Sequence, residues 1–269
     1  MKNVIRSQLY QLVLDKAIFL IILMWLIMDS VDIGSILYEI SLSGKACSGG
    51  KMLSSDWFQM SEVFIAVITS MIMTKDYFDK TLYYEFMSGK SRSAIFMGRF
   101  IVALVISEVG MLLSMWCFPL VYTAVCGWGE ELAVSGAVQR TLICMLIAFR
   151  ICAEFALFSV IFRRKALTYF MMVILELVPT IVTEFFYGVY YEECEKWEPF
   201  MPLLNVFTII NIENVTDFEK IKNTDSAGNT TYIASPLPAN TEYIIAFAAG
   251  IGILAFVRAL SVFSRKDME

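Results

Sequence analysis

The side chains best placed to do chemistry in this sequence are ionisable residues that interrupt long apolar runs. The acids Glu62, Glu108, Glu154 and Glu176 lie in such runs, as does Arg150. An uncompensated charge at the centre of a bilayer costs at least about 2.5–3.5 kcal/mol, so each should face another charge, a cavity or a subunit seam. Further ionisable residues nearer the ends of runs are Asp29, Asp32, Glu184 and Arg258.

Arg150 and Glu154 are four residues apart, which makes them neighbours on one side of a helix. Glu108 falls at a similar depth in its own run, so we expect Arg150 to pair with Glu154 or with Glu108. Two interpretations stay open: ion pairs that lock a helix bundle, and acids that line a path for a cationic or amphipathic cargo. Glu62 and Glu176 are the best candidates for path-lining acids, because their own runs hold no basic neighbour.

The chain lacks residues that several kinds of catalytic, metal and nucleotide site require. It has no histidine, which removes His-based zinc sites and every Ser–His or Cys–His nucleophile. Gly89-Lys90-Ser91 is similar to the end of a phosphate-binding loop, but Tyr84 stands where the earlier glycine is required. We therefore expect a chain that is not an enzyme and that holds no metal or nucleotide of its own.

Membrane-spanning helices must position these side chains. Hydrophobic residues make up 58% of the 269 positions, and charged residues 17%. A bilayer core requires roughly 20 apolar residues per helix. We predict an all-α membrane protein with six transmembrane helices, at residues 17–37, 57–73, 100–124, 141–162, 166–187 and 243–263. Residues 1–16 favour a helix lying along the membrane surface ahead of this domain of residues 17–269, with an ordinary juxtamembrane tail as the alternative.

Lysine and arginine set the expected orientation, because they gather in connections on the cytoplasmic side. One set of connections holds Lys2, Arg6, Lys16, Lys75, Lys80, Lys90, Arg92, Arg99, Arg163, Arg164, Lys165, Arg265 and Lys266. The other set holds only Lys45, Lys51, Arg140, Lys196, Lys220 and Lys222. Both termini are therefore expected in the cytoplasm, in a multi-pass protein of the cell membrane.

The inner connection at residues 74–99 favours a short helix that projects from the membrane. Phe78, Leu82 and Phe86 would give that helix an apolar side that a soluble partner can bind. Gly89 favours the end of the helix, and Ser91 favours the N-cap of the next one, which runs into the third span. A helix that rests on its own membrane surface is the alternative.

This connection resembles that of permease subunits in type-2 ABC exporters. The family commonly shows an acid, then Gly-Thr-aliphatic, a further short helix and a Gly/Pro-x-Ser-Arg turn. Here Asp76 and Asp79 are followed by Lys80-Thr81-Leu82 and by Gly89-Lys90-Ser91-Arg92. Lys80 replaces the usual glycine, and Phe86-Met87 replaces the more usual Leu and Ser, which leaves the local turn geometry open. With six spans and both termini inside, the resemblance covers nearly the whole chain and is to bacterial proteins.

The resemblance implies a fold and a role. Two permease subunits, identical or different, would enclose a translocation path in the membrane lipid. Each would carry a coupling helix that docks on a separate ATP-binding subunit, where ATP and magnesium would bind; no nucleic acid is implied. The coupling residues that it implies are Asp76, Asp79, Thr81, Leu82, Glu85, Phe86, Gly89, Ser91 and Arg92.

The last outer loop, residues 188–242, is too long for a simple turn. Its apolar part, residues 199–212, predicts a re-entrant or interfacial helix, and residues 217–231 predict a polar, exposed tip. Two of the outer cysteines Cys47, Cys126 and Cys194 could pair, and the sequence does not choose which. Small residues in the sixth run favour close helix packing within the subunit, with a dimer seam as the alternative.

The expected function is that of the permease subunit of an ATP-driven exporter for an amphipathic or cationic peptide. One rival is an ion-coupled secondary transporter in which Glu108, Arg150 and Glu154 form a relay. The other is a membrane sensor that moves no solute. The energy source distinguishes the exporter from the secondary transporter, because only the exporter requires an ATPase partner.

Overall fold

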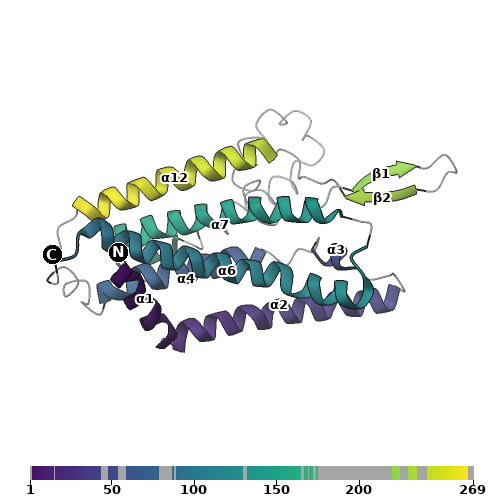
Figure 1. Ribbon diagram of the computed structural model, residues 1–269, viewed down its shortest axis with the longest axis horizontal. Coiled ribbons are helices and arrows are strands. Elements are labelled where there is room, and N and C mark those ends of the chain that lie inside the picture. The colour runs from purple at the N-terminus through teal and green to yellow at the C-terminus, as the bar shows by residue number, and fades with distance from the viewer. Residues whose placement is uncertain are drawn as a thin grey trace.

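A computed structural model describes residues 2–14, 16–43, 48–53, 59–78, 87, 89–129, 132–164, 167–168, 170–171, 174, 220–224, 230–234 and 241–265. The long helices within these ranges lie side by side (Figure 1). They are α2 (Lys16–Ser43), α4 (Gln59–Phe78), α6 (Arg92–Cys126), α7 (Val134–Phe162) and α12 (Thr241–Arg265). The shorter elements are α1 (Lys2–Leu14), α3 (Gly49–Met52) and the antiparallel strands β1 (Lys220–Thr224) and β2 (Thr230–Ala234).

Three helices among the described residues, α6, α7 and α12, are long and apolar enough to cross a membrane. Shorter apolar stretches are Lys16–Ile27 in α2 and Ser61–Thr74 in α4. The described residues of the predicted runs at 17–37, 57–73, 100–124, 141–162 and 243–263 all fall on helices, whereas the run at 166–187 lies almost wholly outside the described residues. At about 1.5 Å per residue, the 35 residues of α6 extend about 52 Å, well beyond a bilayer core of about 30 Å.

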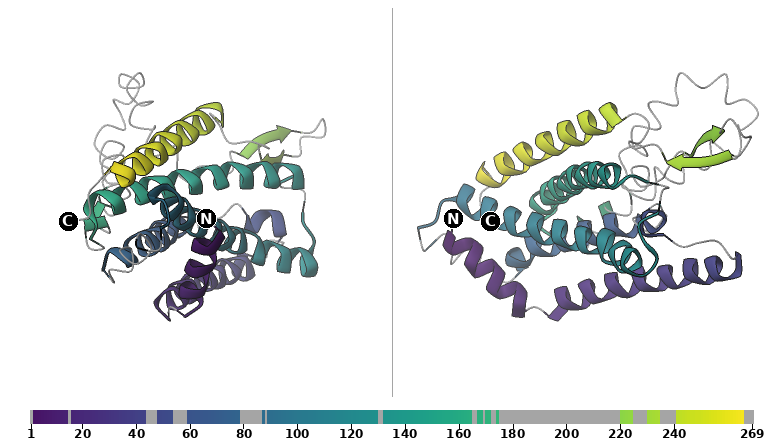
Figure 2. Two further views of the ribbon diagram at one scale, coloured as in Figure 1. Left: turned by 60° about the vertical axis from the view of Figure 1, so that its left-hand side comes forward. Right: turned by 45° about the vertical axis from the view of Figure 1, so that its right-hand side comes forward.

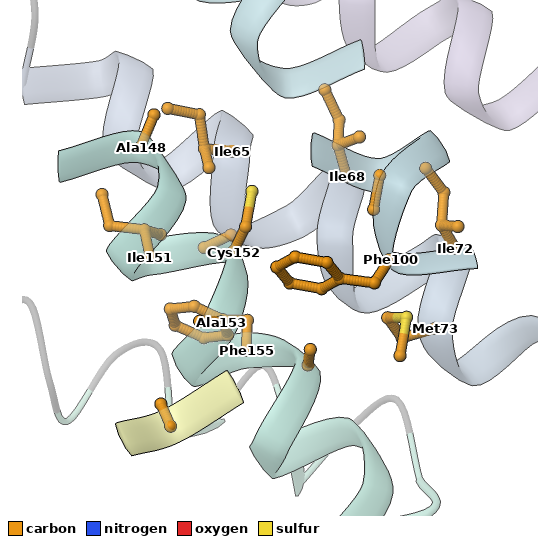
Figure 3. Packing of buried hydrophobic residues seen from close by; sticks show 14 of the residues in the cluster. Ile65, Ile68, Ile72, Met73, Phe100, Ala148, Ile151, Cys152, Ala153 and Phe155 are labelled. Atoms are coloured by element: carbon orange, nitrogen blue, oxygen red, sulfur yellow. The ribbon is translucent and has the colours of Figure 1, made fainter. Parts of the chain in front are cut away.

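The centre of the bundle is an apolar core between α4, α6 and α7. Figure 3 shows Ile65 and Ile68 of α4 opposite Ile151 and Cys152 of α7, with Phe100 of α6 beside them. Trp25 extends this core to α2, because its ring stacks on Phe64 of α4 with the ring centroids 5.1 Å apart.

Helix α12 makes its most extensive contact with α7 through small residues. Ala248, Gly252 and Ala259 are buried there. A Cβ added at Gly252 would lie 3.2 Å from the Cα of Arg150 and 2.9 Å from the ring of Phe149. These buried small residues pack within the subunit, whereas Ala246 and Gly250 of the same run are exposed.

Helix α1 lies across one end of the bundle, opposite the hairpin (Figure 2). It confirms a helix within residues 1–16 and is held against α6 by close packing. Val4 is fully buried, and a Cβ at Gly98 would come within 2.7 Å of its Cγ1. Leu9 and Tyr10 are exposed on the other side of the helix.

The opposite end is closed by a contact between two connections. The backbone N–H groups of Gly49 and Gly50 donate to the carbonyls of Gly127 (3.1 Å) and Trp128 (2.8 Å). The ring of Trp128 stacks on that of Trp116, with the centroids 6.1 Å apart. We call this contact between α3 and residues 127–128 the outer clasp.

The hairpin of β1 and β2, in and beside the polar segment 217–231, is regular structure that was not predicted from the sequence, and it is a small addition to the otherwise helical described residues. The strands pair in antiparallel register, with Ile221 opposite Ile233. Both segments are rich in β-branched residues, and the turn formers Asp225, Gly228 and Asn229 lie between them. These signals are typical of a hairpin, but the prediction for this segment was based on its polar composition alone.

Candidate functional site

The connection between α4 and α6 lies at the end of the bundle crossed by α1, where α12 also ends (Figure 1). Basic residues of the described chain gather at this basic end, on α1 and at the matching ends of the long helices. They are Arg6, Lys16, Lys90, Arg92, Arg99, Arg163, Arg164, Arg258 and Arg265. This clustering is the one that the sequence predicts for the cytoplasmic side.

The structure describes four of the predicted coupling residues: Asp76, Gly89, Ser91 and Arg92. Asp76 belongs to the last turn of α4. Gly89 has a φ of 78°, a left-handed conformation that suits glycine and marks a turn. Ser91 caps α6, because its Oγ accepts a hydrogen bond from the backbone N–H of Ala94 at 3.3 Å. The remaining predicted coupling residues, Asp79, Thr81, Leu82, Glu85 and Phe86, lie outside the described residues.

Arg92 has a contact that the sequence does not predict. Its Nη1 donates a hydrogen bond to the backbone carbonyl of Ser264, in the last turn of α12, at 3.2 Å. The side chain is half-buried. This guanidinium therefore reaches another helix of its own chain.

A fully buried arginine within α7 corrects the predicted boundary of the fourth run. Arg140, expected in an outer connection, has no exposed surface, since α7 begins at Val134 rather than near residue 141. Glu62 of α4 is also buried, with 3% of its surface exposed. Both residues lie within Coulombic range of the buried thiol of Cys144.

The expected ion pair in α7 is present. Nη1 of Arg150 lies 4.0 Å from Oε1 of Glu154, so the arginine pairs within its own helix rather than with Glu108. Glu108 is half-buried midway along α6, and its Oε2 is buried without a hydrogen bond from any described residue. Glu176 lies outside the described residues.

Neutral polar side chains also form hydrogen bonds between these helices. The hydroxyl of Thr69 in α4 donates to Sγ of Cys152 in α7 at 3.2 Å, and this bond joins the two helices. Trp116 of α6 donates through Nε1 to the hydroxyl of Thr141 in α7 at 3.1 Å. We use the term polar layer for the polar residues of α4, α6 and α7 described here: Glu62, Thr69, Glu108, Arg140, Thr141 and Cys152. Sequence reasoning missed the interhelical bonds because each joins runs that are far apart in the chain.

The chemistry available to this layer is electrostatic. No group of three or more Cys, Asp or Glu residues in the described ranges could hold a metal ion. The layer can bind or repel a charge, and Glu108 is a residue of it that is only half-buried. Comparison of the sequence with protein-family models gives no match, and neither does comparison with curated proteins.

Proposed function

We propose that this chain is the permease subunit of an ATP-driven exporter. A separate ATP-binding chain would dock at the basic end and drive the conformational change of the permease. The observation that carries the proposal is the place of the α4–α6 connection. It leaves the bundle at the end where the basic residues gather, and α6 is longer than a bilayer core is thick, so part of this helix can extend out of the membrane. A soluble ATPase in the cytoplasm can reach a segment in that position. The likeness of the segment to the coupling region of type-2 permeases supports the same reading.

The polar layer supports an amphipathic or cationic cargo. A carboxylate that is half-buried midway along a spanning helix is costly unless a cation or water reaches it. Glu108 meets this description, whereas Glu62 is almost fully buried and Glu154 is paired with Arg150. We therefore assign contact with the cargo to Glu108 in preference to Glu62.

Co-purification from native membranes tests the docking. A nucleotide-hydrolysing protein should accompany the wild-type chain and should be lost from the variant Glu85→Lys, in the predicted coupling helix. The matched control is Glu242→Lys, which makes the same charge change on an exposed residue at the opposite end of the bundle. Equal retention of the ATPase by both variants would exclude residue 85 from the docking surface.

Reconstitution tests the energy source. Export by vesicles that contain the chain and its ATPase should stop when the ATPase is inactivated by substitution in its nucleotide site. Uptake or export driven by an ion gradient with the chain alone would instead identify a secondary transporter. A chain that binds ligand and moves none of it under either condition would identify a sensor.

A further inference from the structure

Arg92 stands at an unfavourable place in its own helix. It is the first residue of α6, and a helix N-terminus carries a partial positive charge that disfavours a cation. The first turn of α6 also contains no acid that would offset the charge. The benefit of an arginine at this position must therefore come from outside α6.

The C-terminal end of α12 supplies that benefit. The last carbonyls of a helix lack intrahelical partners and carry a partial negative charge. Nη1 of Arg92 donates to one of them, the carbonyl of Ser264, across 172 residues of sequence. The charge of Arg92 is thus unfavourable at the N-terminus of α6 and favourable at the C-terminus of α12.

Aromatic packing joins the same two helix ends within the bundle. The ring centroids of Phe96 and Phe263 are 5.5 Å apart, and those of Phe100 and Phe256 are 4.8 Å apart. Phe96 is fully buried, and tilted aromatic pairs at these separations are attractive beyond their burial. The first turns of α6 and the last turns of α12 thus share a polar contact at the end of the bundle and an aromatic contact inside it.

We propose that Arg92 is a positioning residue that joins α6 to the C-terminal end of α12, so that both helices move together when the α4–α6 connection is displaced. The source of the displacement rests on the proposed function, in which an ATPase pushes on that connection. The contact itself does not rest on it. Arg92 then transmits the movement to α12 and is not part of the surface that binds the ATPase.

Distance measurements on the isolated chain test the contact. Spin labels are placed on the exposed residues Ser93 and Arg265, by substitution with cysteine, after Cys47, Cys117, Cys126 and Cys194 are replaced by serine. The distance distribution should be narrow, should broaden in Arg92→Gln, and should narrow again in Arg92→Lys, which restores a cationic donor. Arg164→Gln removes an exposed charge at the same end and should leave the distribution unchanged. An unchanged distribution in Arg92→Gln would overturn the proposal.

Coupling measurements on the complex with the ATPase test the transmission. The Arg92→Gln variant should keep the ATPase bound and hydrolysing ATP, while transport per ATP falls about tenfold, within the 5–150-fold range of typical couplings between sites. Loss of the ATPase from this variant would show that Arg92 belongs to the docking surface, and the proposal would be wrong. If the wild-type chain binds no ATPase, the proposed function fails, and the spin-label distances still decide whether Arg92 joins the helices.

Discussion

Arg150 and Glu154 form an ion pair one turn apart in α7, with the arginine Nη1 4.0 Å from the glutamate Oε1. The pair is largely withdrawn from solvent, with 9% and 19% of the two side chains exposed. Gly252 of α12 packs on the backbone of the same arginine. The pair therefore lies under the contact between α7 and α12, and changes there should be read first as changes in stability.

We expect Glu154→Gln to lower the free energy of unfolding by about 1–3 kcal/mol, less than for a fully buried pair because Glu154 is partly exposed. The substitution leaves the charge of Arg150 uncompensated. The double variant Arg150→Met with Glu154→Leu should recover most of the loss, since it removes both charges. Thermal unfolding in detergent measures both, and a double variant as unstable as Glu154→Gln would contradict this account.

Neutralising Glu108 should separate transport from stability. We expect Glu108→Gln to impair transport of a cationic cargo while the melting temperature stays the same or rises, because the variant removes a half-buried charge whose Oε2 has no hydrogen bond from the described residues. Glu62→Gln is the comparison, and it should lower the melting temperature, because it changes a polar side chain that is almost fully buried between helices. Equal destabilisation by both substitutions would assign Glu108 a structural role.

A larger residue at position 252 should force α12 away from α7. We expect Gly252→Leu to lower the free energy of unfolding by about 1–3 kcal/mol, the usual effect of overpacking. Gly250 is the control, because a Cβ at that position meets nothing within 4 Å. Thermal unfolding of the two leucine variants makes the comparison, and similar melting temperatures would show that α12 adapts without cost.

The attachment of α1 depends on Gly98. A leucine there would occupy the space of Val4, so Gly98→Leu should release α1 from α6 and leave the long helices in place. Hydrogen–deuterium exchange should then increase in residues 2–14 alone. Gly34→Leu in α2, where a Cβ meets nothing within 4 Å, should leave the exchange of these residues unchanged. Unchanged protection in Gly98→Leu would show that another contact holds α1.

Cysteine labelling tests the orientation. Cys126 ends α6 and is exposed at the end of the bundle that carries the outer clasp. A membrane-impermeant maleimide added to intact cells should modify a variant whose only cysteine is Cys126, whereas a Cys144-only variant should not react, because Cys144 is buried. Reaction of Cys126 only in inside-out vesicles would reverse the predicted orientation.

Helix positions were predictable because apolar runs are local in the sequence. The ends of the helices were less so, and Arg140 shows why. The predicted run was ended at its first charged residue, but a helix can continue past a charge that faces the interior. Helix α7 begins at Val134, seven residues before the predicted start at Thr141, and includes the buried Arg140. Ser91 was predictable as a cap, because the partner of its hydroxyl is three residues away.

The contacts that join distant runs were not predictable from the sequence. The Arg150–Glu154 pair was, because helical periodicity alone brings the two residues together. The hydrogen bonds from Arg92 to Ser264 and from Thr69 to Cys152 depend on how separate helices are arranged. The periodicity of one apolar run carries no information about that arrangement. The sequence therefore favoured Glu62 as a path-lining acid, whereas the fold leaves only 3% of its surface exposed.

The outer clasp implies an order of events during insertion into the membrane. The N–H groups of Gly49 and Gly50 take their partners from residues that follow α6. During synthesis these donors emerge long before their acceptors, so the clasp can form only after the whole of α6 has been made. Closure of the clasp is thus a late event in folding, and it joins the segment ahead of α4 to the segment that follows α6.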